Sequence, residues 1–297
     1  MFRPNRFSPK KPRSDPRSPP ARPCPDMPQT ITHLSEILGS VDGLLLDQFG
    51  VLHDGKRAFP GAIECVQALQ ERGVPMVALS NSGRLAKPNA DRLARLGFPV
   101  SAFKAIVTSG ELARDLLLQR LADKRLSEGG AVLLLSREND QSLIDDLPVT
   151  GANPGAPVEL VIISGNNPET HSREDYRRLL TPLARAGVPA ICANPDTTIY
   201  AGNQASYGPG LVAKDYADAG GEVVYLGKPD AAMFSAGLRA LGPVTPERCL
   251  MIGDSPRHDI LGGNRAGCRT LLITSGVQAG TPDNGATADF SMETLRF

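Results

Sequence analysis

Polar side chains that could do chemistry follow several short apolar runs of the chain. Asp47, Ser80, Lys228 and Asp254 each come at or just after the end of such a run, and Asp259 lies five positions after Asp254. Mg²⁺ is usually bound by one or two carboxylates together with water and phosphate oxygens. An ammonium and a hydroxyl can hold further oxygens of a phosphoryl group. If the fold brings these residues together, they form a site for a divalent cation and a phosphate.

The apolar runs that precede these residues alternate with helical patterns. The predicted strands are 41–46, 74–79, 105–108, 131–135, 160–163, 190–193, 223–226, 249–252 and 270–274. Short buried strands that alternate with helices predict a mostly parallel sheet covered on both faces. Ligands of such sheets bind beyond the carboxyl ends of the strands. The polar residues therefore lie where an α/β protein would place its site.

The composition is that of an ordinary globular protein with a basic N-terminal segment. The 297 residues, enough for about two domains, include 32 Lys and Arg and 32 Asp and Glu. Residues 1–27 hold seven of the basic and two of the acidic residues, which leaves 25 basic and 30 acidic residues in the rest. Because a body of negative net charge is a poor general binder of nucleic acid, we expect no nucleic-acid partner.

No part of the chain indicates a membrane or an oxidising compartment. No apolar stretch reaches the roughly 18–20 residues that span a bilayer, and the N-terminus lacks the apolar centre of a secretory signal. The five cysteines are scattered and form no CxxC pair, which argues against a zinc site and a disulfide framework. We expect a cytoplasmic protein with no membrane partner. Residues 1–27, with eight prolines, are predicted to be disordered.

The polar residues belong to longer segments that follow one another in a characteristic order. These are DQFGVLHDG (47–55), ALSNSG (78–83), VTSGELA (107–113), CANPD (192–196), GKPDAAMF (227–234) and MIGDSPRHDILGGNRAG (251–267). Together they resemble the motifs of the haloacid dehalogenase (HAD) superfamily, and more narrowly its NagD-like and pyridoxal-phosphate-phosphatase-like subclass. The resemblance covers nearly all of residues 40–277, and the last two segments are its most specific part.

This resemblance implies an α/β fold in two parts. One is a Rossmann-like HAD core with a parallel sheet, and the other is a large α/β cap domain inserted into it. The core is expected over residues 28–125 and 210–297, and the cap over residues 126–209. Members of the subclass often dimerise through the cap, so the resemblance also implies a possible homodimer.

The resemblance assigns catalytic and substrate-binding roles by position in the motifs. Asp47 is expected to be the nucleophile that forms an aspartyl-phosphate, Ser80 to bind the transferring phosphoryl group, and Lys228 to stabilise its charge. The substrate is expected to be a small phosphorylated metabolite whose leaving group is recognised by the cap. Asn81 beside Ser80, and Asn194 in the CANPD segment, are the further candidate substrate-binding residues.

The same resemblance implies a Mg²⁺ cofactor. Its expected ligands are Asp47, Asp254 and the backbone carbonyl of Phe49, while Asp259 would orient a metal-bound water or Lys228. A carboxylate approaches an anionic phosphate only when positive charge offsets their repulsion, and the cation would supply that charge.

Phe49 is the one departure from the pattern of the family's phosphatases. These enzymes have a second Asp two positions after the nucleophile, which protonates the leaving oxygen and then activates water. A phenyl ring cannot do this, and general acid–base catalysis is typically worth about 10²–10⁴ in rate. Leaving groups that are weak bases, such as a phenolate, an enolate or a carboxylate, are expected to suffer least.

Three hypotheses follow from Phe49. The chain is a phosphohydrolase that is slow, or acts on activated phosphates, or uses His53, Asp54 or His258 as its acid. Alternatively it is a non-catalytic phosphate- or nucleotide-binding module. The third alternative is a metal-independent 2-haloacid dehalogenase, because those enzymes also have an aromatic residue at the position of Phe49. The retained pair Asp254 and Asp259 argues against the third, because without a cation it would repel the nucleophile.

Overall fold

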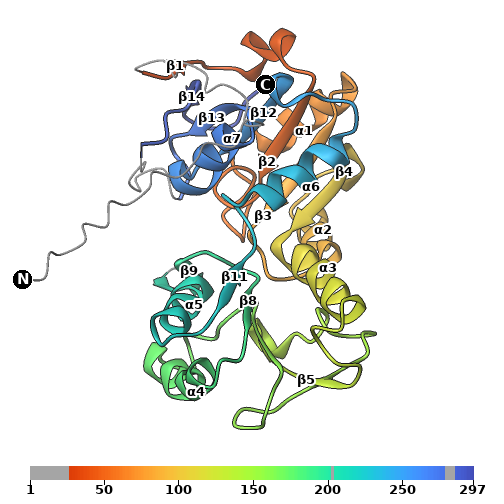
Figure 1. Cartoon of the computed structure of the whole chain (residues 1–297). Helices are drawn as coiled ribbons and strands as arrows, with labels where there is room; N and C mark the ends of the chain where they lie inside the picture. Colours follow the sequence, from red (N-terminus) through yellow and green to blue (C-terminus); the bar gives the residue numbers. More distant parts are fainter. Residues whose placement is uncertain (1–26, 202–203, 278–284) are drawn as a thin grey trace, which may run out of the picture.

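The computed structural model describes residues 27–201, 204–277 and 285–297. These residues form two parallel sheets with helices around them, one above the other in Figure 1. The predicted disorder of residues 1–27 falls almost wholly outside the described residues. In the described part of the chain, every helix is too short or too polar to cross a membrane.

The first sheet has seven strands and is parallel throughout. In spatial order they are β1 (Gln29–Thr30), β14 (Phe290–Met292), β13 (Arg269–Ile273), β12 (Cys249–Gly253), β2 (Gly43–Asp47), β3 (Met76–Ser80) and β4 (Phe103–Thr108). The strand β2 lies between β12 and β3, so the residues that follow these three strands emerge side by side.

The core of this part lies on both faces of the first sheet. Every residue of β2 is buried. Because successive strand residues point to opposite faces, Leu44 and Leu46 belong to one apolar cluster and Leu45 to the other. This burial on both sides explains why the strand sequence is continuously apolar rather than alternating.

The second sheet has five strands and is also parallel. In spatial order they are β11 (Val223–Tyr225), β8 (Ala190–Cys192), β7 (Leu160–Ile163), β5 (Gly130–Leu135) and β6 (Val149–Gly151). A separate antiparallel hairpin pairs β9 (Thr198–Ala201) with β10 (Gln204–Tyr207).

The inserted domain ends later than predicted. Its sheet includes β11, which pairs with β8, so residues 210–225 belong to the cap and the boundary predicted at residue 209 is wrong. The apolar run 223–226 has the pattern of any buried parallel strand, and such a pattern does not say which sheet the strand joins.

The helices cover the faces of the two sheets. They are α1 (Ala62–Glu71), α2 (Ala86–Arg95), α3 (Ser109–Ala122), α4 (Arg173–Arg185), α5 (Pro209–Asp218), α6 (Ala231–Leu241) and α7 (Leu261–Arg265). In Figure 1, α3 leads from the first sheet to the second, and α6, which follows β11 along the chain, packs against the first sheet.

Candidate active site

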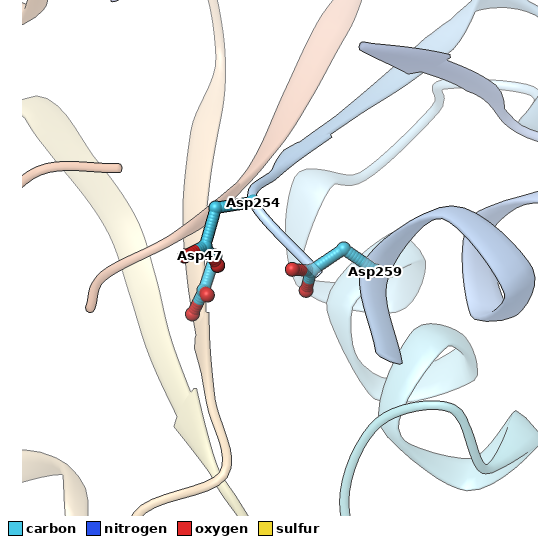
Figure 2. Close-up of side chains that lie close together, drawn as sticks. All are labelled: Asp47, Asp254 and Asp259. Atoms are coloured by element: carbon cyan, nitrogen blue, oxygen red, sulfur yellow. The ribbon is translucent and has the colours of Figure 1, made fainter. Parts of the chain in front are cut away.

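Three carboxylates meet at the carboxyl ends of two neighbouring strands. Asp47 is the last residue of β2, Asp254 follows β12, and Asp259 lies in the π-helical turn Pro256–Ile260. One oxygen from each lies within 4.8 Å of the others, and all three residues are buried. In Figure 2 the carboxylates of Asp47 and Asp254 lie side by side and that of Asp259 points toward them. The predicted convergence of these residues is confirmed.

Lys228 joins two of these carboxylates. Its Nζ lies 2.6 Å from Oδ1 of Asp47 and 2.8 Å from Oδ1 of Asp259, and its side chain is 3% exposed. Asp259 also accepts a hydrogen bond from the backbone N–H of Ser255 at 3.0 Å. The ammonium thus neutralises part of the negative charge that the chain buries here.

Charge and burial change the pKa values of this group. Burial raises the pKa of Asp47 well above its ordinary value, the charges of Asp259 and Asp254 raise it further, and Lys228 only partly opposes them. Burial works against the charge of Lys228, but the carboxylates of Asp259 and Asp47 outweigh it and raise the pKa of Lys228. Lys228 is therefore charged, and its single positive charge does not balance the three carboxylates beside it.

Glycines leave room around the carboxylates. A Cβ on Gly50, whose φ is +95°, would lie 2.0 Å from Oδ2 of Asp254, and a Cβ on Gly276 would lie 2.2 Å from Asp254 Cβ. A Cβ on Gly253 would lie 2.1 Å from Cβ of Asp259. No other residue type fits at these positions without displacing a carboxylate.

Ser80 is the last residue of β3 and Asn81 follows it, next to Asp47, and both line the same cavity. The Oγ of Ser80 accepts a hydrogen bond from the N–H of Ser82 at 3.2 Å. Asn81 is 6% exposed, and its Oδ1 accepts the N–H of Lys228 at 2.7 Å. Its Nδ2 donates to Oδ1 of Asp196 at 2.8 Å. Asn81 therefore ties the lysine to the cap, a role that its sequence neighbourhood does not show.

The cap supplies Asn194, Asp196 and neighbouring residues to the cavity wall. The Oδ1 of Asn194 accepts the N–H of Asp196 at 3.1 Å, which fixes this loop. From the core side, Nδ1 of His258 lies 3.6 Å from Oδ1 of Asp196. Burial lowers the pKa of His258 although Asp196 and Asp259 favour its charge.

Phe49 lines the cavity beside Asp47. Its ring meets that of His53 edge to face, with 6.1 Å between centroids. His53 is buried and its Nδ1 accepts the N–H of Gly55 at 3.0 Å; burial lowers its pKa to about 4. Asp54 caps the turn by accepting the N–H groups of Lys56 and Arg57 at 2.8 and 2.7 Å. His53 and Asp54 thus hold the loop, and the ring of Phe49 packs against His53 in the wall of the cavity.

The cavity has a volume of about 400 Å³ and is lined by core and cap residues. Besides the predicted residues, it is lined by four cationic side chains: Lys56, Arg84, Arg92 and Arg137. They lie outside the motifs or at motif edges, and nothing in their spacing distinguishes them from solvated surface residues. Arg84 makes an ion pair with Glu138 of the cap at 2.6 Å.

Comparisons with known proteins agree with the geometry. A model of haloacid dehalogenase-like hydrolases matches residues 44–148, and a second HAD-hydrolase-like model matches residues 225–296. Mouse (Mus musculus) chronophin is 32% identical over 256 residues, which are 83% of this chain and 85% of that protein. The ribonucleotide monophosphatase NagD of Escherichia coli is 28% identical over 81% of this chain and 90% of that protein.

A solved structure supports the same conclusion. The haloacid dehalogenase-like hydrolase of Brucella suis is 29% identical. Its superposition has a TM-score of 0.79 and covers 89% of this chain and 99% of that one. The matched regions include Asp47 and the segment from Lys228 to Asp259. The chain belongs to the haloacid dehalogenase-like hydrolase family, and within it to the NagD-like branch of phosphatases.

Proposed function

We propose that this phosphatase is a Mg²⁺-dependent phosphohydrolase that acts on a small phosphorylated metabolite through an aspartyl-phosphate on Asp47, with Phe49 in place of the usual acid. One observation carries the proposal. The Lys228 ammonium bridges Asp47 and Asp259 beside Asp254, at a cavity that the cap also lines. A nucleophile, a neutralising cation and room for a substrate therefore coincide.

The carboxylates fit a magnesium ion. All three offer oxygen, the ligand atom that Mg²⁺ prefers, and their oxygens lie within 4.8 Å of one another. Three carboxylates against one ammonium leave negative charge that a divalent cation would balance. Asp47 and Asp254 would hold the ion with the backbone carbonyl of Phe49, and Asp259 would support them. When bound, the ion lowers the repulsion between the nucleophile and the phosphate.

The residues of this chain would then act in sequence. A carboxylate oxygen of Asp47 forms a bond to phosphorus, and the bond between phosphorus and the ester oxygen breaks, so that the leaving group departs with the electron pair. Lys228 and the hydroxyl of Ser80 stabilise the charge on the transferring phosphoryl group. Water then attacks the phosphorus, which releases inorganic phosphate and restores the carboxylate of Asp47.

Phe49 determines which leaving groups depart easily. Because the phenyl ring donates no proton, an alkoxide leaves as a strong base, whereas a phenolate, enolate or carboxylate leaves as a weaker one. The observation that His53 and Asp54 are used to hold the loop supports this preference. We therefore expect aryl, enol and acyl phosphates to be better substrates than alkyl phosphates.

A phosphatase panel with and without Mg²⁺ tests the proposal. It contains acyl, aryl and alkyl phosphates and one 2-haloacid, and it compares the wild type with Asp47→Asn and with the exposed control Asp91→Asn. Phosphate release that needs Mg²⁺ and Asp47 but not Asp91 is expected. Full activity in Asp47→Asn contradicts the proposal. Halide release indicates a dehalogenase, and Mg²⁺-dependent ligand binding without turnover indicates a non-catalytic module.

The same proposal includes a cytoplasmic location and a homodimer through the cap. The described cysteines Cys65, Cys192, Cys249 and Cys268 are free and buried, which supports a reducing compartment. The homodimer stays a prediction from the family resemblance, and sedimentation of the purified protein would test it.

A further inference from the structure

Arg92 stands out among the arginines of the cavity because no described carboxylate forms an ion pair with it. Arg84 pairs with Glu138 at 2.6 Å and with Asp140 at 3.5 Å, and Arg137 pairs with Glu169 at 2.5 Å. Arg92 lines the same cavity, and among the residues that the structure describes no carboxylate lies within ion-pair distance of its guanidinium. A partly buried cation without an anion is unfavourable unless a ligand supplies one.

The local structure directs Arg92 into the cavity. It lies in α2, three positions after Asn89, so both side chains leave the same face of the helix. Asn89 is buried, and its Nδ2 donates to Oγ of Ser82 at 3.3 Å and to the carbonyl of Leu85 at 2.9 Å. This face of α2 is therefore held against the loop that follows Ser80, next to the proposed phosphoryl site.

The surroundings of Arg92 favour an anion. Burial lowers its pKa, and the charges of Arg84 and Arg95 lower it further, against a smaller opposite effect of Glu138. Arg92 also lowers the pKa of the buried His53, which meets the ring of Phe49. Arg92 thus places a positive charge beside the part of the cavity wall that Phe49 forms.

We propose that Arg92 binds a second anionic group of the substrate, so that the enzyme selects phosphate esters whose leaving group carries a carboxylate or a similar anion. This inference rests on the proposed phosphohydrolase function and names its substrate class. The fork of N–H donors in arginine suits a carboxylate, which it binds with two parallel hydrogen bonds. The fixed phenyl ring of Phe49 would contact the apolar part between the two anionic groups.

Matched aryl phosphates test the assignment. The probes are 2-, 3- and 4-carboxyphenyl phosphate and uncharged phenyl phosphate, and the measured quantity is the ratio of kcat/KM for the best carboxylated ester to that for phenyl phosphate. We expect a ratio of about 10–100 in the wild type, the range of a charge-assisted hydrogen bond. Arg92→Gln is expected to bring the ratio close to one, and Arg92→Lys to restore part of it.

The matched control is Arg95→Gln, which removes an exposed arginine from the same helix and is expected to keep the ratio. A wild-type ratio near one, or an unchanged ratio in Arg92→Gln, overturns the inference. Because a general loss of structure lowers both rates by the same factor, it cannot by itself produce the expected fall of the ratio.

Binding measurements distinguish a failure of this inference from a failure of the proposed function. Calorimetry with the same esters is carried out on Asp47→Asn with and without Arg92→Gln. If the wild type hydrolyses none of the phosphates, the proposed function fails. Tighter binding of the carboxylated ester that depends on Arg92 would still support the anion site, and equal binding of both esters would overturn it.

Discussion

In the proposed function, Phe49 stands in place of the acid that protonates the leaving group. Its ring lines the cavity and rests edge to face on His53, and a Cβ on Gly55 would lie 3.2 Å from its Cε2. A side chain at this position therefore faces the cavity that Asp47 also lines. If the proposed function is correct, a carboxylic acid introduced here lies within reach of the ester oxygen.

Phe49→Asp is expected to raise the turnover of alkyl phosphates more than that of aryl phosphates. The kcat for alkyl phosphates is expected to rise by at most about 10²–10⁴-fold, the usual size of general acid–base catalysis. Steady-state kcat values for a sugar phosphate and for 4-nitrophenyl phosphate check this. Phe49→Asn is the control, because it is polar and of similar size to Asp but is not an acid. Equal changes for both substrates would show that residue 49 does not face the leaving oxygen.

At the scale of elements, α4 and α5 are joined by one carboxylate with two partners. Asp215 of α5 accepts hydrogen bonds from Nε and Nη2 of Arg173 at 2.6 and 2.7 Å and from Nη2 of Arg177 at 2.9 Å, and both arginines belong to α4. Its side chain is 9% exposed. Beneath it, Tyr176 and Tyr216 belong to the apolar cluster between these helices and the second sheet. The ion pairs therefore fix how the two helices pack against the second sheet.

Asp215→Asn is expected to lower the stability of the cap by about 1–2 kcal/mol, because it removes the charge from all three hydrogen bonds while the arginines stay partly exposed. Asp218→Asn on the same helix is the control. It breaks only an exposed pair with Lys214 four positions earlier, worth about 0.3–0.5 kcal/mol. Urea unfolding of both variants measures the difference, and equal losses would contradict the assignment.

The contribution of Asp215 should also depend on pH. Burial favours its neutral form, but the hydrogen bonds from Arg173 and Arg177 outweigh burial and hold its pKa below the ordinary value. A lowered pKa in the folded state means that the stabilisation is complete above the ordinary pKa and is lost as the pH falls through the lowered one. The difference in unfolding free energy between wild type and Asp215→Asn should therefore shrink on acidification below about pH 4.

The sequence predicts the buried strands of both sheets well and the extent of the cap less well, for a physical reason. Runs such as 249–252 and 160–163 coincide with observed strands because a strand buried on both faces must be continuously apolar. The assignment of β11 to the cap depends on pairing with β8, a contact that no local pattern records. The same limit applies to Asn81, which bonds to Lys228 and Asp196, and to Arg92, which lines the cavity, because both positions depend on residues distant in the chain.

At the scale of the whole molecule, the two domains touch through backbone at Gly83. A Cβ built on Gly83, in the loop after β3, would lie 2.0 Å from the carbonyl oxygen of Ser164, just after β7 of the cap. The ion pair from Arg84 to Glu138 lies at the same boundary. Glycine at residue 83 is thus what lets the cap approach the loop of Ser80 this closely.

Gly83→Ala is expected to hold the cap away from the core, because two backbones cannot yield as a flexible side chain does. We expect a larger radius of gyration in solution scattering and a loss of kcat/KM on the order of 100-fold, the cost of misplacing groups around a substrate by about 1 Å. Gly39→Ala is the control, since nothing lies within 4 Å of a Cβ there. Unchanged scattering and kinetics in Gly83→Ala would refute the close contact.

The return of the chain from the cap has a consequence for how such proteins diversify. Only Leu226 and Gly227 separate β11 from Lys228, yet Asn81 of the core holds both the N–H and the carbonyl of Lys228, at 2.7 and 3.4 Å. The ammonium is thus anchored by the domain that carries the nucleophile. Evolution can therefore exchange the inserted domain for one of another size or specificity while the reacting groups keep their places.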